Sequence, residues 1–131
     1  MTPTMCLAMA LYFEVRGEMK HNPHPGYAVA EVIMNRVEDR RWPDNVCAVI
    51  QQDKGPKPHD CQFSFYCDGK SDKMGDVKAR EQSIAIAKDV LAGERPLGIT
   101  SNHYHTDKVN PSWNKRMEFD GLIGGHLFFT Y

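Results

Sequence analysis

The chain has 131 residues, of which 41% are hydrophobic and 25% charged, a balance typical of one globular domain spanning 1–131. Its formal net charge of −1, with six histidines counted as neutral, gives no basic footprint for nucleic acid. Because no apolar stretch is long enough to cross a bilayer, stable membrane insertion is not expected.

The first predicted helix covers residues 5–16, with Thr4 as its N-cap. Its apolar side chains recur at helical spacing, and Glu14 continues that apolar stripe instead of facing solvent. Gly17 is expected to end the helix or to bend the chain. A carboxylate in this position is the first candidate for chemistry.

A second helix is predicted over 26–38. Apolar residues cover most of its circumference, and Glu31, Asn35 and Glu38 share the remaining face. This pattern is typical of a helix that is buried on most sides.

A short third helix is predicted to begin after a cap at Asp44 or Asn45 and to run to Gln52. The segment that follows, 53–75, is polar and carries glycine, proline and aromatic residues. Long irregular segments inside compact domains are often functional, so this one is a candidate for part of a site.

A fourth helix is predicted over 77–92, with Asp76 as its cap and Gly93 at its end. The stretches 100–106 and 126–131 are predicted to be strands, joined by a loop that includes the glycines of DGLIGG. The expected class is therefore α+β, a helical body with a small antiparallel sheet or hairpin.

The environment of Glu14 favours a proton donor. Its neighbours Tyr12, Phe13 and Val15 are apolar or aromatic, and loss of water disfavours an ionised carboxylate, which raises its pKa. A carboxyl group that stays neutral near pH 7 can protonate a glycosidic oxygen. The competing interpretation is an ordinary helix-end glutamate that pairs with Arg16 or lines the surface at a frayed helix end.

Glu18 lies four residues after Glu14. On an unbroken helix the two carboxylates would share a face, about 6 Å apart along the axis, as in a glycosidase carboxylate pair. Because Gly17 is expected to break the helix between them, Glu18 is interpreted as a residue that orders the following loop.

The loop CQFSFYCDG, residues 61–69, combines amide, hydroxyl and aromatic groups. Sugars need this mixture, because their hydroxyls bond to polar side chains and their apolar ring faces stack on aromatic rings. Trp113, in NPSW, is a further indole that would stack on a sugar at the edge of a groove. The alternative is a loop that a disulfide closes or the core anchors.

Four cysteines allow three full pairings, and the sequence does not choose among them. Cys6 fits a small core residue in the first helix. Cys61 and Cys67 are placed to close the loop between them, with Cys47 as a rival partner. A fully reduced chain is the remaining alternative.

The stretch NHYH offers a different site. In a strand, His103 and His105 point to the same face, and His126 would supply the third nitrogen of a zinc site. No HExxH motif is present, and a histidine in the apolar terminal strand is ordinarily a core residue.

Six stretches in order give the chain a resemblance to a known family: LYFEVRGE, AVAEVIMNRV, WPDNVCAVI, CQFSFYCDG, HYHTDKVNPSW and IGGHLFF. Together they resemble the SleB-type cell wall hydrolases, the catalytic domains of spore-cortex-lytic enzymes and related phage and bacterial lysins. The resemblance implies a lysozyme-like α+β domain whose groove binds the glycan strands of peptidoglycan. It also implies cleavage between N-acetylmuramic acid and N-acetylglucosamine without a metal or cofactor.

The resemblance also assigns roles to residues. The first glutamate of the family's E-x-R-G-E motif is its catalytic acid, and it falls on Glu14. The expected substrate contacts are the groove segment Gln62, Phe63 and Ser64, then Tyr104 and His105 on a strand opposite the acid, with Trp113 beside them. Asn35 and Arg36 match an NRV element that is interpreted as structural.

The implied chemistry needs one acid, as in lytic transglycosylases. Glu14 would protonate the glycosidic oxygen and then, as a base, take the proton of the muramoyl C6 hydroxyl, which closes an anhydro ring. Attack by water instead would give plain hydrolysis, and the sequence leaves both outcomes open.

The beginning of the chain lacks the basic start and cleavage site of a signal peptide. Combined with the resemblance, this fits a monomeric phage endolysin that is made in the cytoplasm and reaches the wall through a holin-type partner. A spore enzyme or a trimmed catalytic domain is the alternative. Two other function classes stay open: a zinc amidase or peptidase that uses His103, His105 and His126, and a wall-binding module without activity.

Overall fold

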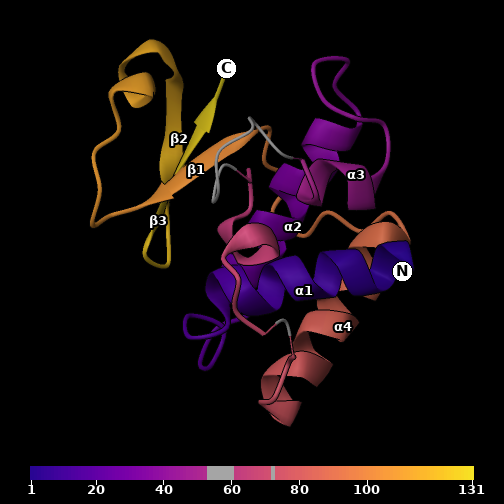
Figure 1. The fold of residues 1–131 in the computed structure, drawn as a ribbon. Helices are drawn as coiled ribbons and strands as arrows, with labels where there is room; N and C mark the ends of the chain where they lie inside the picture. Colours follow the sequence, from indigo (N-terminus) through magenta and orange to yellow (C-terminus); the bar gives the residue numbers. More distant parts are fainter. Residues whose placement is uncertain (53–60, 72) are drawn as a thin grey trace.

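The computed structural model describes residues 1–52, 61–71 and 73–131, and shows helices packed beside a small antiparallel sheet (Figure 1). The described elements are α1 (Pro3–Val15), α2 (His24–Val37), α3 (Val46–Ile50), η1 (Ser64–Cys67), α4 (Val77–Leu91), β1 (His103–Thr106), η2 (Ser112–Arg116), β2 (Glu118–Ile123) and β3 (His126–Thr130), where η marks a 3-10 helix. The predicted α+β class is confirmed. None of these helices has the length and apolarity that crossing a bilayer requires.

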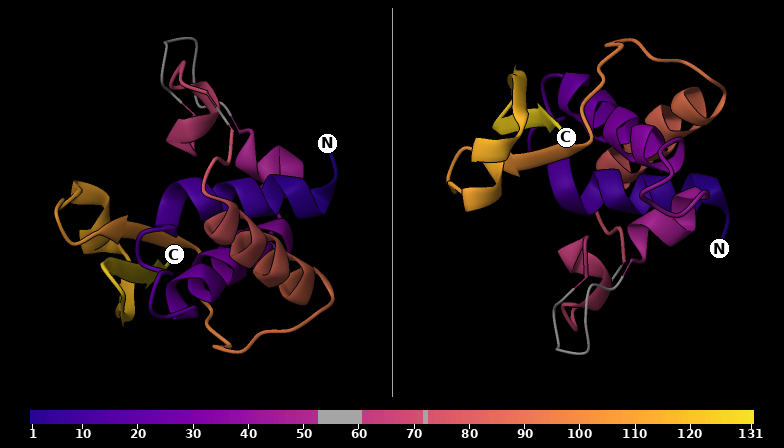
Figure 2. Two further views of the ribbon diagram at one scale, coloured as in Figure 1. Left: turned by 90° about the horizontal axis from the view of Figure 1, so that it is seen from below. Right: turned by 90° about the horizontal axis from the view of Figure 1, so that it is seen from above.

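Helix α1 runs through the helical body and contacts α2, α3 and α4. Its apolar side chains form the centre of the core together with those of α2 and α4. The fully buried residues of this core include Leu7, Leu11, Val29, Ile33 and Val90. In the views of Figures 1 and 2, the sheet lies on one side of this body and the N-terminus on the other.

The predicted start of α1 was two residues late. Thr2 is the N-cap in place of Thr4, and its Oγ1 accepts a hydrogen bond of 3.2 Å from the Met5 amide. Pro3 occupies the first turn, where a residue without an N–H costs no helical hydrogen bond. The helix ends at Val15, one residue before the expected end.

The other helices lie close to their predicted positions. Helix α2 begins at His24, earlier than expected, because Pro25 is compatible with a first helical turn. Asn45 caps α3 and Asp76 caps α4, each by accepting a hydrogen bond from the amide three residues on. Helix α3 is shorter than predicted and ends at Ile50.

Glu31 differs from its expected place on the more polar face of α2. Its side chain is fully buried, and its carboxylate accepts hydrogen bonds from the amides of Leu97 (3.0 Å) and Ile99 (3.2 Å). The carboxylate therefore ties the segment before β1 to α2, and supplies the partners that buried backbone amides require.

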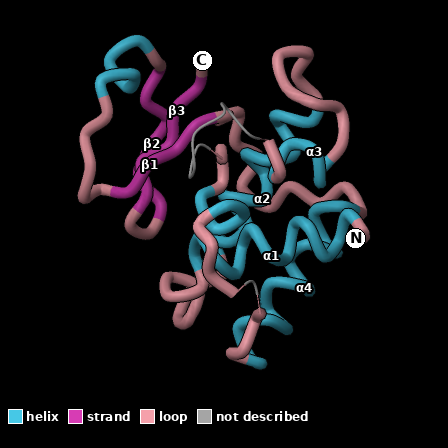
Figure 3. Tube along the Cα trace, viewed as in Figure 1, coloured by secondary structure: helices cyan, strands magenta, loops and turns pink. Residues whose placement is uncertain are grey.

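The sheet has the strand order β1-β3-β2, with both neighbouring pairs antiparallel (Figure 3). The two predicted strands are found, although β1 begins at His103 rather than at residue 100. Strand β2 was predicted to be loop. Asp120 and Gly121 depress strand propensity, and a register shift between Phe119 and Gly121 breaks the alternation that would have marked a strand.

Two disulfides join the four cysteines, so no described cysteine is free. Cys6, predicted to be only a core residue, is buried but bonded to Cys47, which links α1 to α3. Cys61 and Cys67 close the loop that carries η1. Part of the predicted irregular segment, 53–60 together with residue 72, lies outside the described residues.

Candidate active site

Glu14 lies in the last turn of α1, and Tyr104 reaches it from β1. The Tyr104 hydroxyl donates a hydrogen bond of 3.3 Å to Glu14 Oε1. Burial raises the pKa of the Glu14 carboxyl above its ordinary value of 4.5, while the Tyr104 hydrogen bond and the charges of His126 and Arg36 lower that pKa part of the way back. The environment therefore favours the neutral acid predicted from the sequence.

Arg16 does not neutralise Glu14. Its Nη1 donates a short hydrogen bond to the Tyr12 hydroxyl, and its guanidinium carbon lies 4.6 Å from the centre of the Tyr12 ring. The same hydroxyl accepts a hydrogen bond of 2.9 Å from the Asp76 amide. Among the ion pairs of the described residues, none joins Glu14 to Arg16, so the structure does not show the pairing with Arg16.

Glu18 orders a loop, but the loop that it holds is the hairpin turn between β2 and β3 and not the segment that follows Glu18 in sequence. Its Oε1 accepts a hydrogen bond of 2.6 Å from the Gly125 amide, and its Oε2 lies 2.9 Å from His126 Nδ1. Gly124 has a φ of +61°, and a Cβ there would lie 2.5 Å from the Glu18 carboxylate. The two glycines therefore let the turn approach the end of α1 closely.

Tyr104 stays protonated at the pH values where the acid works. Burial and the nearby Glu14 carboxylate raise the pKa of the Tyr104 phenol well above its ordinary value of 10.0. Its ring lies 5.3 Å from the His126 ring and 5.7 Å from the Phe128 ring, centre to centre. These three side chains share the face of the sheet that turns toward Glu14 and Glu18.

The three histidines of the alternative zinc site do not converge. Successive residues of a strand point to opposite faces, so His103 and His105 lie on the other face from Tyr104. The rings of both contact Trp113, at 5.6 Å and 5.4 Å between centres, whereas His126 pairs with Glu18. In the ranges that the structure describes, no three histidine, cysteine or acidic residues could hold a metal.

A hollow of about 440 Å³ lies beside Tyr104. It is lined by Arg36, Cys61, Gln62, His103, Tyr104, Trp113 and Met117. Tyr104 connects the hollow to the acid, since it lines the hollow and bonds to Glu14. The structure thus brings together three of the predicted substrate contacts: Gln62, Tyr104 and Trp113.

The other predicted contacts lie elsewhere. The Phe63 side chain is buried and Ser64 is exposed at the beginning of η1, and neither lines the hollow. His105 is bonded to the Thr106 carbonyl through Nδ1 (2.7 Å) and accepts from Asn114 through Nε2 (3.2 Å). Strand alternation is the signal that could have separated His105 from Tyr104, because adjacent strand residues cannot both face the acid.

Arg36 is the main residue that the sequence analysis missed as part of the site. Its side chain is almost fully buried, and its Nε donates a hydrogen bond of 2.7 Å to the Asn102 carbonyl, which supports the structural interpretation. Its guanidinium carbon lies 5.4 Å from the Trp42 ring centre and 6.0 Å from that of Phe63. Yet Arg36 also lines the hollow, which the helical pattern alone could not indicate.

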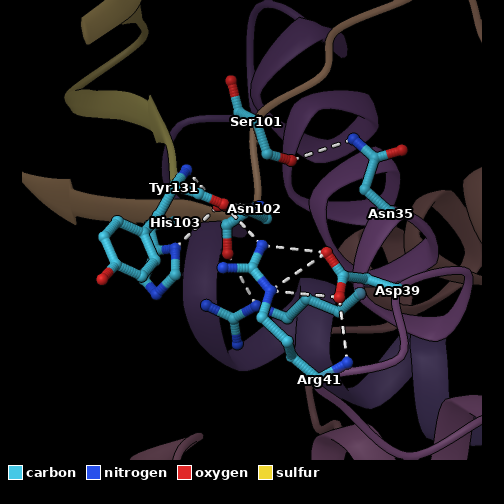
Figure 4. Close-up of polar contacts among 8 residues, drawn as sticks. Asn35, Asp39, Arg41, Ser101, Asn102, His103 and Tyr131 are labelled. Atoms are coloured by element: carbon cyan, nitrogen blue, oxygen red, sulfur yellow. Dashed lines mark hydrogen bonds and ion pairs between the residues drawn. The ribbon is translucent and has the colours of Figure 1, made fainter. Parts of the chain in front are cut away.

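Asn102 lies at the centre of a polar network that joins the beginning of β1 to Tyr131 (Figure 4). Its Oδ1 accepts hydrogen bonds from the Tyr131 amide (3.0 Å) and from His103 Nδ1 (2.8 Å), and its Nδ2 donates to the Tyr131 carbonyl (3.2 Å). Arg41, paired with Asp39 at 2.9 Å, also donates to that carbonyl. The network holds the last residue and the beginning of β1 against the end of α2.

Comparison with known proteins identifies the family. A sequence model described as Cell Wall Hydrolase matches residues 23–129. The chain belongs to this family. It is similar to the spore cortex-lytic enzymes of Halalkalibacterium halodurans (32% identity) and Oceanobacillus iheyensis (31%), in each case over 93% of the chain. It spans 33% and 39% of the length of these two proteins.

The fold agrees with that of a solved member of this kind. The catalytic domain of the germination-specific lytic transglycosylase SleB from Bacillus anthracis matches with a TM-score of 0.70 and 25% identity. The match covers 98% of this chain and 93% of that domain. The resemblance to the SleB-type cell wall hydrolases and the lysozyme-like α+β fold are therefore confirmed. Because the family model begins at residue 23, the case for Glu14 as the acid rests on its geometry.

Proposed function

We propose that this cell wall hydrolase domain cleaves peptidoglycan glycan strands between N-acetylmuramic acid and N-acetylglucosamine, with Glu14 as its single catalytic acid. The observation that carries the proposal is a carboxyl group whose pKa is raised by burial, bonded to a tyrosine that lines a hollow. Glu18 is engaged by Gly125 and His126, which leaves it poorly suited to act as a second catalytic carboxylate. The name of the related SleB domain favours the lytic transglycosylase reaction.

In the proposed reaction, Glu14 gives its proton to the glycosidic oxygen, and the bond breaks through an oxocarbenium-like state. The Tyr104 hydroxyl then donates to the newly ionised Glu14 carboxylate, which stabilises it in its dry environment. That carboxylate takes the proton of the muramoyl C6 hydroxyl as its oxygen attacks the anomeric carbon. The enzyme is thereby restored and the product ends in an anhydro ring. Glu14 serves in both steps, and no metal or cofactor is needed.

The sugar contacts of this proposal are Gln62, Tyr104 and Trp113. Their amide, phenol and indole groups line one hollow, the combination that sugar rings and hydroxyls require. Phe63 is buried and does not line the hollow, while Ser64 and His105 would contact the glycan beyond the hollow.

For the setting, we infer a monomer that acts on the cell wall after release from the cytoplasm. The related phage and bacterial lysins suggest the role of a phage endolysin with a holin-type partner. The curated relatives are named spore cortex-lytic enzymes, which makes spore cortex the second candidate substrate. Faster digestion of cortex than of vegetative walls would favour the spore role.

The decisive experiment compares the wild type, Glu14→Gln and Glu81→Gln on purified peptidoglycan. Glutamine cannot donate the proton, so turbidity loss should fall by about 10²–10⁴-fold in Glu14→Gln. Glu81 is exposed on α4, and its substitution should leave the rate unchanged. Mass spectrometry of the fragments should show anhydro termini. Near-normal cleavage by a folded Glu14→Gln variant would overturn the proposal, and reducing termini would replace transglycosylation by hydrolysis.

A further inference from the structure

We propose that Arg36 makes the hollow selective for N-acetylated amino sugars, so that strands whose sugars carry free amino groups are poor substrates. This inference rests on the proposed function, because it concerns which glycan strands the same hollow accepts. It assigns to Arg36 a specificity-determining role in addition to its bond to Asn102.

Arg36 is an unusual cation for the wall of a binding hollow. Its side chain is 2% exposed, although charged groups are rarely buried without a partner of opposite sign. None of the ion pairs found in the described residues includes it. Its Nη1 is buried without a hydrogen-bond partner in those residues, while its Nε is committed to the Asn102 carbonyl.

Burial lowers the pKa of Arg36, and the described groups whose charges raise it are the Tyr104 phenol and the Glu14 carboxyl. Glu14 must be protonated, and hence neutral, when substrate enters for cleavage. At that moment the guanidinium has no charged ion-pair partner among the residues that the structure describes. The wall of the hollow therefore carries a positive charge when a sugar enters. This charge is screened less well than it would be in water.

This charge distinguishes two forms of the same sugar. An acetamido group is neutral, and its carbonyl oxygen is an acceptor that a guanidinium N–H can satisfy. A free amino group is protonated at mildly acidic pH, so it is a like charge with no acceptor. Such a mismatch disfavours the wrong ligand through repulsion rather than through shape.

The other lining residues suit an acetamido sugar. Trp113 and Met117 provide apolar surface for an acetyl methyl group or a sugar ring face. Gln62 adds an uncharged amide that can both donate and accept. Among the described residues that line the hollow, none is an acid that could receive an ammonium group.

The test uses one preparation of peptidoglycan in three states: native, chemically N-deacetylated, and deacetylated and then re-acetylated with acetic anhydride. At pH 6 the wild type should cleave the deacetylated walls at least about tenfold more slowly than native walls. Re-acetylation should restore the rate, which excludes damage to the strands. The ratio of the rate on native walls to the rate on deacetylated walls should shrink as rising pH neutralises the amines. Since Glu14 titrates on both substrates, the native walls control for its titration.

Variants assign the selectivity to the Arg36 charge. Arg36→Met removes the charge and should bring the two rates to within about twofold of each other. Arg36→Lys keeps the charge and should keep the discrimination. Arg40→Met makes the same change of charge at an exposed position four residues on, and should behave as the wild type. Circular dichroism shows which variants are folded.

Equal wild-type rates on native and deacetylated walls would overturn the inference while leaving the proposed function intact. A wild-type ratio of native to deacetylated rates that does not change with pH would overturn the inference even if Arg36→Met fails to fold. A folded Arg36→Met variant with the same ratio as the wild type would also overturn it. If native walls yield no cleaved glycan bond, the proposed function itself fails.

Discussion

At the residue scale, the protonation of Glu14 depends on a balance between desolvation, which favours the neutral acid, and polar neighbours, which favour the carboxylate. Burial raises its pKa, whereas the Tyr104 hydrogen bond and the positive charges of His126 and Arg36 lower it. The acid works only when protonated, so activity should be lost as pH rises through this pKa. The pH at which the falling limb of the pH–rate profile lies therefore reports the pKa of Glu14.

Tyr104→Phe tests the balance, because it removes the hydroxyl that stabilises the ionised carboxylate and keeps the ring. The pKa of Glu14 should rise further, so the falling limb should move to higher pH, by up to about one unit. The maximal rate should drop, since the ionised acid loses a donor. Initial rates on purified walls from about pH 4 to about pH 9, roughly the range in which a raised carboxyl titrates, check this. A limb that stays in place or moves to lower pH contradicts the role of Tyr104.

The approach of Tyr104 to Glu14 illustrates what sequence reasoning could and could not predict at this scale. Helical periodicity was enough to place Glu14 on an apolar stripe, and the resemblance placed Tyr104 opposite it. The role of Arg36 in the hollow was missed, because its burial depends on Trp42 and Phe63, which come from other segments of the chain.

At the element scale, the helices follow local patterns and caps, whereas the sheet depends on contacts distant in sequence. Strand β2 pairs with β3 despite its glycine and its register shift. The hairpin between them is held through Glu18, which the helix α1 places nearby. Such a strand cannot be predicted from its own residues, since its stability comes from its partner.

The hairpin glycine therefore carries a stability prediction. Gly124→Ala should lower the free energy of unfolding by about 1–3 kcal/mol, because alanine is strained at a φ of +61° and its Cβ would meet both Glu18 and Pro25. Gly17→Ala is the matched control, since a Cβ there has no atom within 4 Å. Urea unfolding of both variants is the measurement. Equal stability of the two would show that Glu18 does not hold the hairpin.

At the scale of the whole molecule, the two disulfides occupy different parts of the fold. Cys6–Cys47 joins α1 to α3 in the helical body, away from the hollow, across a sequence separation of 41 residues. Cys61–Cys67 spans 6 residues, and Cys61 lines the hollow beside Gln62. The first bond thus restrains the helical body, and the second shapes the wall of the hollow that is proposed to receive the substrate.

This division predicts separate effects on stability and activity. Replacing Cys6 and Cys47 by alanine should cost about 4 kcal/mol of unfolding free energy, against about 2 kcal/mol for replacing Cys61 and Cys67 by serine, because the longer closed loop loses more entropy. The rate of wall cleavage by folded protein should instead fall mainly in the Cys61 and Cys67 variant, whose loop no longer holds Gln62 in place. Thermal unfolding and turbidity assays below both midpoints separate the two effects. If the first pair controlled the rate and the second did not, the hollow would not be where the glycan binds.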